Sequence, residues 1–323
     1  MQKVFLGIDT SCYTTSVALL NEEGQLVGEA RQLLQVKAGR CGLQQSEMVF
    51  QHTRNLPRLI EEAFSQCDVT LGANAYKLVA IGASATPRSQ KDSYMPAFLV
   101  GWGLARSLAA VHRVPLIKLS HQENHTEAGL WSAGGPKVQR FLTLHASGGT
   151  TDLLLAEQEE EGRYRLTQVG GSIDLHAGQF IDRIGVALGL QFPTGPALEA
   201  LAETATTMVE LPVAVRKLEA SLSGPATAAQ RLLAQGADPA ALALGVEHAL
   251  AETFLRLFRR AAEQYQVQHV LLVGGVGSNK YIRAHLEKGL AKRRIKLYVP
   301  EAKYSCDNAA GCAALAQRLW QRI

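Results

Sequence analysis

Two histidines spaced four residues apart are the first candidates for chemistry in this 323-residue sequence. They lie in Ser120-His-Gln-Glu-Asn-His125, directly after a short apolar run typical of a buried strand. Residues four apart share one face of a helix, so both imidazoles can bind one metal ion. The segment is not the zinc-protease motif, because Gln122 stands where that motif has its glutamate base. The alternative is a pair of ordinary helix-surface histidines.

A third metal ligand must come from elsewhere in the chain, and Asp307 is the candidate. It lies in Tyr304-Ser-Cys-Asp-Asn-Ala-Ala310, after an apolar run at 296–300 and before an alanine-rich segment that predicts a helix. An Asp-Asn pair in this place is also a typical helix N-cap. Both roles stay open, since one residue of the pair can cap the helix while its neighbour binds the metal.

An internal repeat predicts the elements that position these residues. Apolar runs at 4–9, 16–20 and 25–30 are separated by small polar turns, which predicts a three-strand meander. The same pattern recurs at 141–146, 153–156 and 164–169. Helical patterns and further buried strands follow each copy, with the strands at 78–81 and 115–119 in the first half and at 269–273 and 296–300 in the second. Strands alternating with helices predict an α/β fold with mostly parallel sheets.

The duplication, with a polar turn after each first strand, suggests the two-lobed actin/Hsp70/sugar-kinase (ASKHA) fold with duplicated ribonuclease-H-like domains. In that fold the two turns offer backbone N–H groups to phosphates. The run Gly274-Gly-Val-Gly-Ser-Asn279 follows a buried strand, and its glycines let the backbone approach a flat ligand such as adenosine. We expect an N-terminal lobe over 1–137 and a C-terminal lobe over 138–323. The alternative is two unrelated α/β domains.

Composition limits the partners of the chain. With 33 Lys and Arg, 29 Asp and Glu and 47% hydrophobic residues, the chain is neither disordered nor a protein that coats polyanions. Nucleic acid then requires a local patch, and the candidates are Arg31, Lys37, Arg40, Arg54 and Arg58, although acidic residues are interleaved.

The cysteines and the apolar segments indicate a cytoplasmic protein that does not cross a membrane. Five scattered cysteines without a C-x-x-C pair fit a reducing cytosol. The apolar stretch 95–111 is short and carries Gly101, Gly103 and Arg106, so it predicts a buried helix. The first residues predict a strand and no targeting segment.

Eight motifs, in order along essentially the whole chain, resemble the TsaD/Gcp-like family of tRNA threonylcarbamoyladenosine synthase transferase subunits. They are Gly7-Ile-Asp-Thr-Ser-Cys12, Pro115-Leu-Ile-Lys-Leu-Ser-His121-x-x-x-His125, Ser147-Gly-Gly-x-Thr151, Ala177-Gly-Gln-Phe-Ile-Asp-Arg183, Phe192-Pro-Thr-Gly-Pro196, Ser221-Leu-Ser-Gly224, Gly274-Gly-Val-Gly-Ser-Asn-Lys-Tyr281 and Cys306-Asp-Asn-Ala-Ala310.

The resemblance implies an enzyme that binds a threonylcarbamoyl-adenylate in an interlobe cleft. The enzyme transfers the threonylcarbamoyl group to the tRNA adenosine beside the anticodon, with other subunits of a transfer complex as further partners. It also implies one divalent metal ion, Fe²⁺ or Zn²⁺, and an ATP-derived ligand. The candidate residues are His121, His125 and Asp307 for the metal, Ser147, Gly148, Gly149, Asp182, Gly195 and Asn279 for the nucleotide, and Asp9 and Ser147 for catalysis.

Three segments depart from the family pattern and indicate a divergent paralogue. Tyr13 and Thr14 replace two carboxylates of the first turn, Thr150 replaces a histidine of the second, and Gln179 replaces a glutamate. Neutral side chains cannot take acid–base or metal-bridging roles there. The alternative function is therefore a nucleotide-binding regulatory subunit, or a carbamoyl or acyl transferase with another acceptor. His145 and His176 lie nearby and are either replacement ionisable groups or ordinary packed histidines.

Overall fold

The computed structural model describes residues 1–11, 13–36, 43–73, 75–90 and 92–322. The chain divides into two compact units. Unit 1 comprises Met1–Gly135, Gln158–Tyr164 and Cys306–Ile323, and unit 2 comprises Pro136–Glu157 and Arg165–Ser305. Unit 1 therefore includes the C-terminal segment, whereas the sequence analysis assigned everything after residue 137 to the second lobe.

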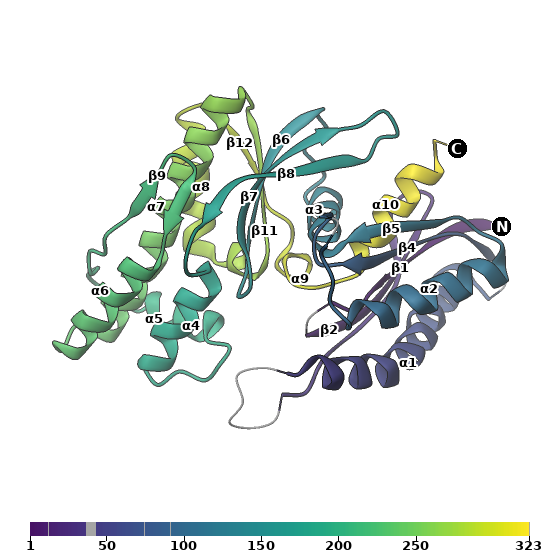
Figure 1. Cartoon of the computed structure of the whole chain (residues 1–323), viewed down its shortest axis with the longest axis horizontal. Helices are drawn as coiled ribbons and strands as arrows, with labels where there is room; N and C mark the ends of the chain where they lie inside the picture. Colours follow the sequence, from purple (N-terminus) through teal and green to yellow (C-terminus); the bar gives the residue numbers. More distant parts are fainter. Residues whose placement is uncertain (12, 37–42, 74, 91, 323) are drawn as a thin grey trace. The chain divides into compact units, whose positions relative to one another are not determined.

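Unit 1 is built on a five-stranded sheet in the order β3-β2-β1-β4-β5 (Figure 1). The strand β1 pairs antiparallel with β2 and parallel with β4. The pairing of β2 with β3 is antiparallel and that of β4 with β5 is parallel. The strands are β1 (Gln2–Asp9), β2 (Thr14–Asn21), β3 (Leu26–Leu33), β4 (Tyr76–Thr86) and β5 (Leu116–Ser120).

Helices cover both faces of this sheet, and β1 and β2 are accordingly buried along nearly their whole length. Alternate residues Val4, Leu6 and Ile8 pack with α1 (Gln45–Leu71) and α2 (Phe98–His112). Phe5, on the opposite face, packs near the end of α10 (Ala310–Trp320). The helix α3 (His121–Ser132) follows β5 directly and packs against α10. The stretch 95–111, proposed as a buried helix, corresponds to α2, but α2 is buried along one face, at Phe98, Gly101, Ala105 and Ala109, and its opposite face is exposed. None of the described helices has the length and apolar character needed to cross a bilayer.

Glycines let α10 lie directly on the sheet. A Cβ atom on Gly7 of β1 would overlap the Ala309 carbonyl oxygen and lie 2.7 Å from the Ala313 nitrogen. A Cβ on Gly82 of β4 would overlap the Cys312 carbonyl oxygen. Backbone cannot yield as a flexible side chain does, so these positions require glycine if α10 is to keep its place.

Unit 2 carries a seven-stranded sheet in the order β12-β11-β6-β7-β8-β10-β9. Five consecutive strands that include one edge of the sheet, read as β8-β7-β6-β11-β12, repeat the order of the sheet in unit 1, which confirms the duplication expected from the sequence. The strands are β6 (Arg140–Ala146), β7 (Thr151–Gln158), β8 (Tyr164–Ser172), β9 (Ala214–Arg216), β10 (Glu219–Ser221), β11 (His269–Val273) and β12 (Lys296–Tyr298).

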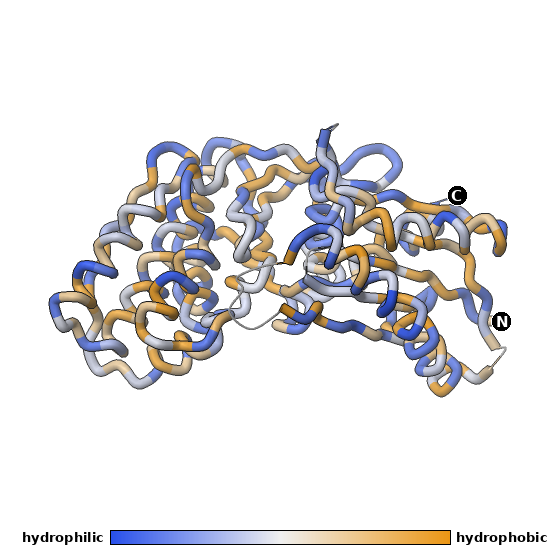
Figure 2. The backbone as a smooth tube through the Cα atoms, turned by 60° about the horizontal axis from the view of Figure 1, so that its bottom comes forward, coloured by the Kyte–Doolittle hydropathy of each residue, from blue (hydrophilic) through white to orange (hydrophobic). Residues whose placement is uncertain are grey.

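The helices of unit 2 bury apolar stripes against one large core, and hydropathy alternates along their turns (Figure 2). Phe254 and Phe258 of the longest helix, α7, are fully buried there. The helices are α4 (Ala177–Ala187), α5 (Gly195–Ala202), α6 (Ser223–Ala234), α7 (Pro239–Tyr265), α8 (Lys280–Ala291) and α9 (Ala302–Ser305), with a 3₁₀ turn η1 (Gly275–Ser278) after β11.

We expect Gly82→Ala to lower the free energy of unfolding by roughly 2–3 kcal/mol, because α10 must move off the sheet. Gly103→Ala is the matched control: Gly103 lies in α2 with open space around its Cβ position, so alanine should be neutral or stabilise by up to about 1 kcal/mol. Urea denaturation measures both. Equal stabilities of the two variants would contradict the close packing of α10.

Candidate metal centre and nucleotide-binding residues

The helix that carries both histidines begins at a complete capping box. Ser120 Oγ accepts a hydrogen bond from the Glu123 nitrogen at 3.2 Å, and the Glu123 carboxylate accepts one from the Ser120 nitrogen at 2.7 Å. Ser-x-x-Glu at the end of a strand is the sequence signature of this arrangement. It sets where α3 starts, and His121 is its first residue.

His121, His125 and Asp307 meet in unit 1. His125 Nε2 lies 3.1 Å from His121 Nε2 and 3.2 Å from Asp307 Oδ1, and His121 Nε2 lies 3.5 Å from the same oxygen. Ligand atoms about 2.0–2.1 Å from an ion in tetrahedral geometry are themselves about 3.3 Å apart. The three atoms thus have the mutual spacing of ligands that share one ion, and their donor types, two imidazoles and a carboxylate, suit Zn²⁺ or Fe²⁺.

The packing of α10 on α3 brings Asp307 to the histidines. The Asn308 carbonyl oxygen accepts a hydrogen bond from Asn124 Nδ2 at 2.6 Å, and a Cβ on Gly311 would overlap the Asn124 carbonyl oxygen. Asn308 Oδ1 accepts from the Ala310 nitrogen at the start of α10. The sequence left both a capping role and a metal-binding role open for this pair. In the structure Asn308 accepts the hydrogen bond at the start of α10, and Asp307 faces the histidines.

A second carboxylate, that of Asp9, lies behind His121. Asp9 is fully buried at the end of β1, and its Oδ2 lies 3.6 Å from His121 Nδ1. The hydroxyls of Ser11 and Ser84 donate hydrogen bonds to its two oxygens. This arrangement resembles the carboxylate–histidine pairs that orient imidazoles in metal sites.

The two carboxylates and two imidazoles shift one another's protonation. Burial alone would lower the pKa of His121, but Asp9 and Asp307 outweigh it and raise that pKa well above its ordinary value. Burial, together with repulsion from His121, lowers the pKa of His125. Hydrogen bonds from both histidines outweigh burial and lower the pKa of Asp307. The cluster is therefore strongly polar within a buried setting, as expected of a cation site.

Two partly buried ion pairs hold α3 in place. Arg163 donates from Nε to Glu123 at 2.8 Å and from Nη2 to the Lys118 carbonyl at 2.7 Å. Arg318 of α10 pairs with Glu127 on the next turn of α3. Sequence analysis missed these residues, because nothing in the local pattern places Arg163 or Arg318 beside α3.

In unit 2, the turn Ser147–Gly149 follows β6 and packs on the start of α4. The Gly178 nitrogen donates to the Ser147 carbonyl at 3.0 Å, and a Cβ on Gly178 would lie 2.6 Å from the Gly148 nitrogen. Gly148 and Gly149 are exposed with open space around them. The first N–H groups of α4 are used within the protein, since Ala177 donates to Thr151 Oγ1 and Gly178 to the Ser147 carbonyl. The backbone N–H groups that suit a phosphate are therefore those of the exposed glycines of the turn.

Gln179 keeps a capping function where the family pattern has glutamate. Its Oε1 accepts from the His176 nitrogen at 3.1 Å, at the start of α4. An amide oxygen can make this hydrogen bond as a carboxylate does, without the charge.

Asp182 and Gly195 come together through Thr194. Asp182 Oδ1 accepts hydrogen bonds from the Thr194 nitrogen at 2.8 Å and from Thr194 Oγ1 at 3.1 Å. Gly195, the next residue, begins α5. One oxygen of Asp182 therefore fixes the chain just before α5.

Asn279 uses its side chain within unit 2. Its Oδ1 accepts from the Ile282 nitrogen at 2.9 Å and so caps α8, and its Nδ2 donates to Glu247 Oε1 at 2.6 Å. Glu247 is 2% exposed on α7, and burial raises its pKa to about 7, helped by repulsion from Glu199 and Glu203. These contacts make Asn279 an anchor for the turn Gly274–Ser278, and sequence analysis did not find its partner Glu247.

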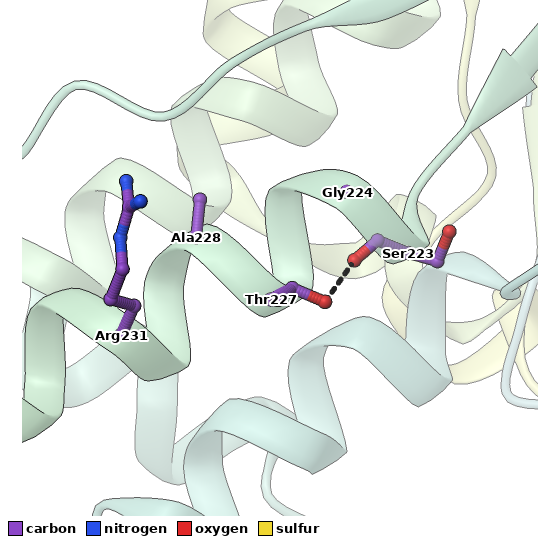
Figure 3. Close-up of a pocket in the computed structure, with 5 residues that line it drawn as sticks. All are labelled: Ser223, Gly224, Thr227, Ala228 and Arg231. Atoms are coloured by element: carbon purple, nitrogen blue, oxygen red, sulfur yellow. Dashed lines mark hydrogen bonds between the residues drawn. The ribbon is translucent and has the colours of Figure 1, made fainter.

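The Ser221–Gly224 motif borders a surface pocket at the start of α6, lined by Ser223, Gly224, Thr227, Ala228 and Arg231 (Figure 3). Asp174 accepts hydrogen bonds from Ser221 Oγ at 2.6 Å and from the Leu222 nitrogen at 2.9 Å. Burial alone would raise the pKa of Asp174, but these bonds and that of Ser223 lower it. The Asp174 carboxylate thus already occupies the N-terminus of α6, so the Ser221–Gly224 motif stabilises the local structure.

We expect Glu247→Gln to stabilise the protein at about pH 8 by roughly 1–2 kcal/mol. The folded pKa of about 7 lies above the ordinary 4.5, so the stability contributed by Glu247 is present below about pH 4.5 and is lost as pH rises through about 7. Glutamine mimics the protonated group and still accepts from Asn279.

Denaturant unfolding over a pH series measures this effect. Glu263→Gln, on the exposed side of the same helix, is the control and should change little. A gain for Glu247→Gln that does not shrink towards acid pH would contradict the assignment.

Comparison with solved structures identifies the fold. HypF from T.kodakarensis matches 99% of this chain and 48% of its own length with a TM-score of 0.65 and 14% identity. A ROK family glucokinase from Streptomyces griseus matches 98% of this chain and 99% of its own, with a TM-score of 0.55 and 12% identity. The chain has the α/β fold of the actin and sugar-kinase class, as the sequence predicted.

Comparison of sequences identifies the family. The family model for tRNA N6-adenosine threonylcarbamoyltransferase matches residues 42–314. A Thermus thermophilus protein of that name is 32% identical over 320 residues, which are 98% of this chain and 93% of the relative. A longer Methanothermobacter thermautotrophicus protein, "Probable bifunctional tRNA threonylcarbamoyladenosine biosynthesis protein", is 30% identical; the match covers 98% of this chain and 56% of that protein. The chain belongs to the tRNA N6-adenosine threonylcarbamoyltransferase family.

Proposed function

We propose that this protein is a metal-dependent transferase that moves a threonylcarbamoyl group from a threonylcarbamoyl-adenylate to the tRNA adenosine next to the anticodon. The observation that carries the proposal is the buried cluster of His121, His125 and Asp307 with Asp9 behind it. A scaffold without chemistry has little use for such a polar cluster, because burying these groups is costly. Membership of the family supplies the reaction class.

The metal is one divalent ion held by His121, His125 and Asp307. When bound, it supplies a Lewis acid and a template for the carbamoyl oxygen and the phosphate. Asp9 acts through His121 as a positioning residue: its contact with Nδ1 keeps Nε2 directed to the shared site. The arginine-paired carboxylates of Glu123 and Glu127 hold the helix itself.

The nucleotide part of the substrate is bound by unit 2. The N–H groups of Gly148 and Gly149 bind phosphate oxygens, and Ser147, whose own N–H donates to the Thr150 carbonyl, contributes its hydroxyl. Asp182 binds the ribose hydroxyls through the oxygen that Thr194 does not use, with Gly195 beside it. Asn279 positions the adenosine-side turn through its bonds to α8 and Glu247.

This transfer requires no covalent enzyme intermediate. The protein acts in the cytoplasm, with other subunits of a transfer complex as partners.

A second candidate is supported by the first turn of unit 1. Tyr13 is 39% exposed and Thr14 is buried at the start of β2, so two neutral side chains stand where the family pattern has carboxylates. A divergent paralogue with this change is a nucleotide-binding regulatory subunit, or a carbamoyl or acyl transferase with another acceptor. Gln179 does not add to this case, because it retains the helix cap.

A reconstituted reaction tests the proposed function. The protein is incubated with labelled threonine, bicarbonate, ATP, an adenylate-forming enzyme and tRNA. We expect label in the tRNA with the wild type and a loss of at least about a hundredfold when His121→Ala and His125→Ala are combined, because metal-site ligands support the chemistry directly. Unlabelled tRNA together with measurable adenine-nucleotide binding would favour the second candidate.

The metal content tests the site independently of activity. We expect anaerobically purified protein to hold about one ion per chain and the His121→Ala, His125→Ala variant to hold essentially none, since it lacks two of three ligands. His112→Ala, at the exposed end of α2, is the control and should retain the metal. Elemental analysis gives the result, and circular dichroism checks the fold. A full complement of metal in the double variant would reject the site.

A further inference from the structure

The positive charge of this chain is concentrated in one part of unit 2. Residues 256–296 contain ten Lys or Arg and two Glu, whereas the whole chain carries a net charge of only +4. The remainder of the sequence is therefore net negative. Such asymmetry is typical of proteins with a local surface for a polyanion.

Four of these arginines, Arg256, Arg259, Arg260 and Arg293, line one surface groove. Among the residues lining it, Glu263 is the acidic one. Lys292, Arg294 and Lys296 lie within three positions of Arg293 in the chain and are exposed. We call these seven residues the basic face.

Main-chain carbonyls hold several guanidinium groups of the basic face in position. Arg259 donates to the Gly289 carbonyl at 2.8 Å, and Arg260 donates to the carbonyls of Val215 and Lys217 at 3.0 and 3.2 Å. Of the four arginines in the groove, Arg256 forms a salt bridge within the described part of the chain, with Glu252. Carbonyl partners fix a guanidinium without cancelling its charge, so the groove stays positive and pre-ordered.

The basic face lies away from the residues proposed to bind the adenylate. The groove includes Gln268 and Ile295, which immediately precede β11 and β12. The turn that begins at Gly274 follows the other end of β11, about 16 Å along five residues of strand. A ligand that contacts both the basic face and the turn at Gly274 must be large because of this distance. It must be polyanionic because the basic face is rich in arginine and lysine.

We propose that the basic face binds the phosphate backbone of tRNA at a distance from the adenosine that is modified. This inference rests on the proposed tRNA-modifying function. RNA carries one negative charge per nucleotide, and arginines fixed in a groove complement such a chain of phosphates. The face positions the substrate without reading its bases.

The basic residues first considered from the sequence fit this role less well. Arg58 pairs with Glu62 at 3.2 Å, and Arg54 lies over the Phe50 ring. Arg31 lies 3.9 Å from Glu29. Lys37 and Arg40 fall outside the described residues. Neighbouring acids thus offset charge in that segment, which makes it a suitable control surface.

The test compares two variants with equal loss of charge. Arg293→Gln with Lys296→Gln removes two charges from the basic face, and Arg54→Gln with Arg58→Gln removes two from α1. Binding of an unmodified tRNA transcript with adenosine beside its anticodon is measured over a series of KCl concentrations. We expect the first variant to bind roughly tenfold or more weakly at about 0.1 M salt, with a salt slope reduced by roughly 1.4–1.8. The control should match the wild type.

Three outcomes would overturn the inference: equal losses in both variants, no measurable tRNA binding by the wild type, or displacement of the tRNA by polyglutamate at equal charge concentration, which would indicate an acidic protein partner. Metal content and adenine-nucleotide affinity of the first variant should equal those of the wild type, and thermal unfolding checks its fold. If the wild type transfers the group normally but its tRNA binding does not depend on the basic face, the proposed function is retained and this inference is rejected. Selective loss of tRNA binding in the first variant, with no transfer by the wild type, would support this inference and reject the proposed function.

Discussion

The close approach of α10 to the sheet and to α3 is the constraint on which the candidate metal centre depends. Backbone touches backbone where Gly7 and Gly82 face α10 and where Gly311 faces α3. This contact fixes the chain just before α10, and Asp307 lies there. A shift of even an ångström would separate the carboxylate from the histidines, because a short aspartate side chain cannot follow. Packing of small residues therefore decides whether three ligands form one site.

Charge compensation is the second requirement of unit 1. Asp9, Asp307, Glu123 and Glu127 are carboxylates on or beside α3, and several are nearly or fully buried. Arg163 and Arg318 neutralise the two glutamates, whereas Asp9 and Asp307 face the imidazoles. Unpaired buried charge is costly, so each carboxylate has a partner. The arginines hold α3 in place. The carboxylates of Asp9 and Asp307 remain beside the histidines, and their negative charge is complementary to a cation.

Unit 2 uses helix starts in a similar way. Gln179 lies in the first turn of α4, and Thr194 and Asn279 directly precede α5 and α8. Each of these side chains makes a defined hydrogen bond. The exposed glycines of the Ser147–Gly149 turn leave backbone N–H groups for a ligand, while the side chains around them maintain the local structure. Most of the residues assigned to nucleotide binding thus have a structural function as well, so effects of their mutation on binding and on stability must be measured together.

The sequence alone determined the regular elements, because apolar periodicity and turn residues act over a few positions. It predicted the two meanders, a helix within 95–111 and the four-residue step that places His121 and His125 on one face. The repeated pattern and the family motifs predicted the fold class. The sequence also named Asp307 as third ligand but left its capping role open, because a local pattern does not distinguish the two.

Only the tertiary structure decided which distant groups meet. It assigned the C-terminal helix to unit 1, divided the roles of Asp307 and Asn308, and joined Asn279 to Glu247. His125 and Asp307 are 182 positions apart. Contacts of that kind arise from the packing of whole helices on sheets, and the energy that selects them is spread over many buried side chains rather than encoded near either residue.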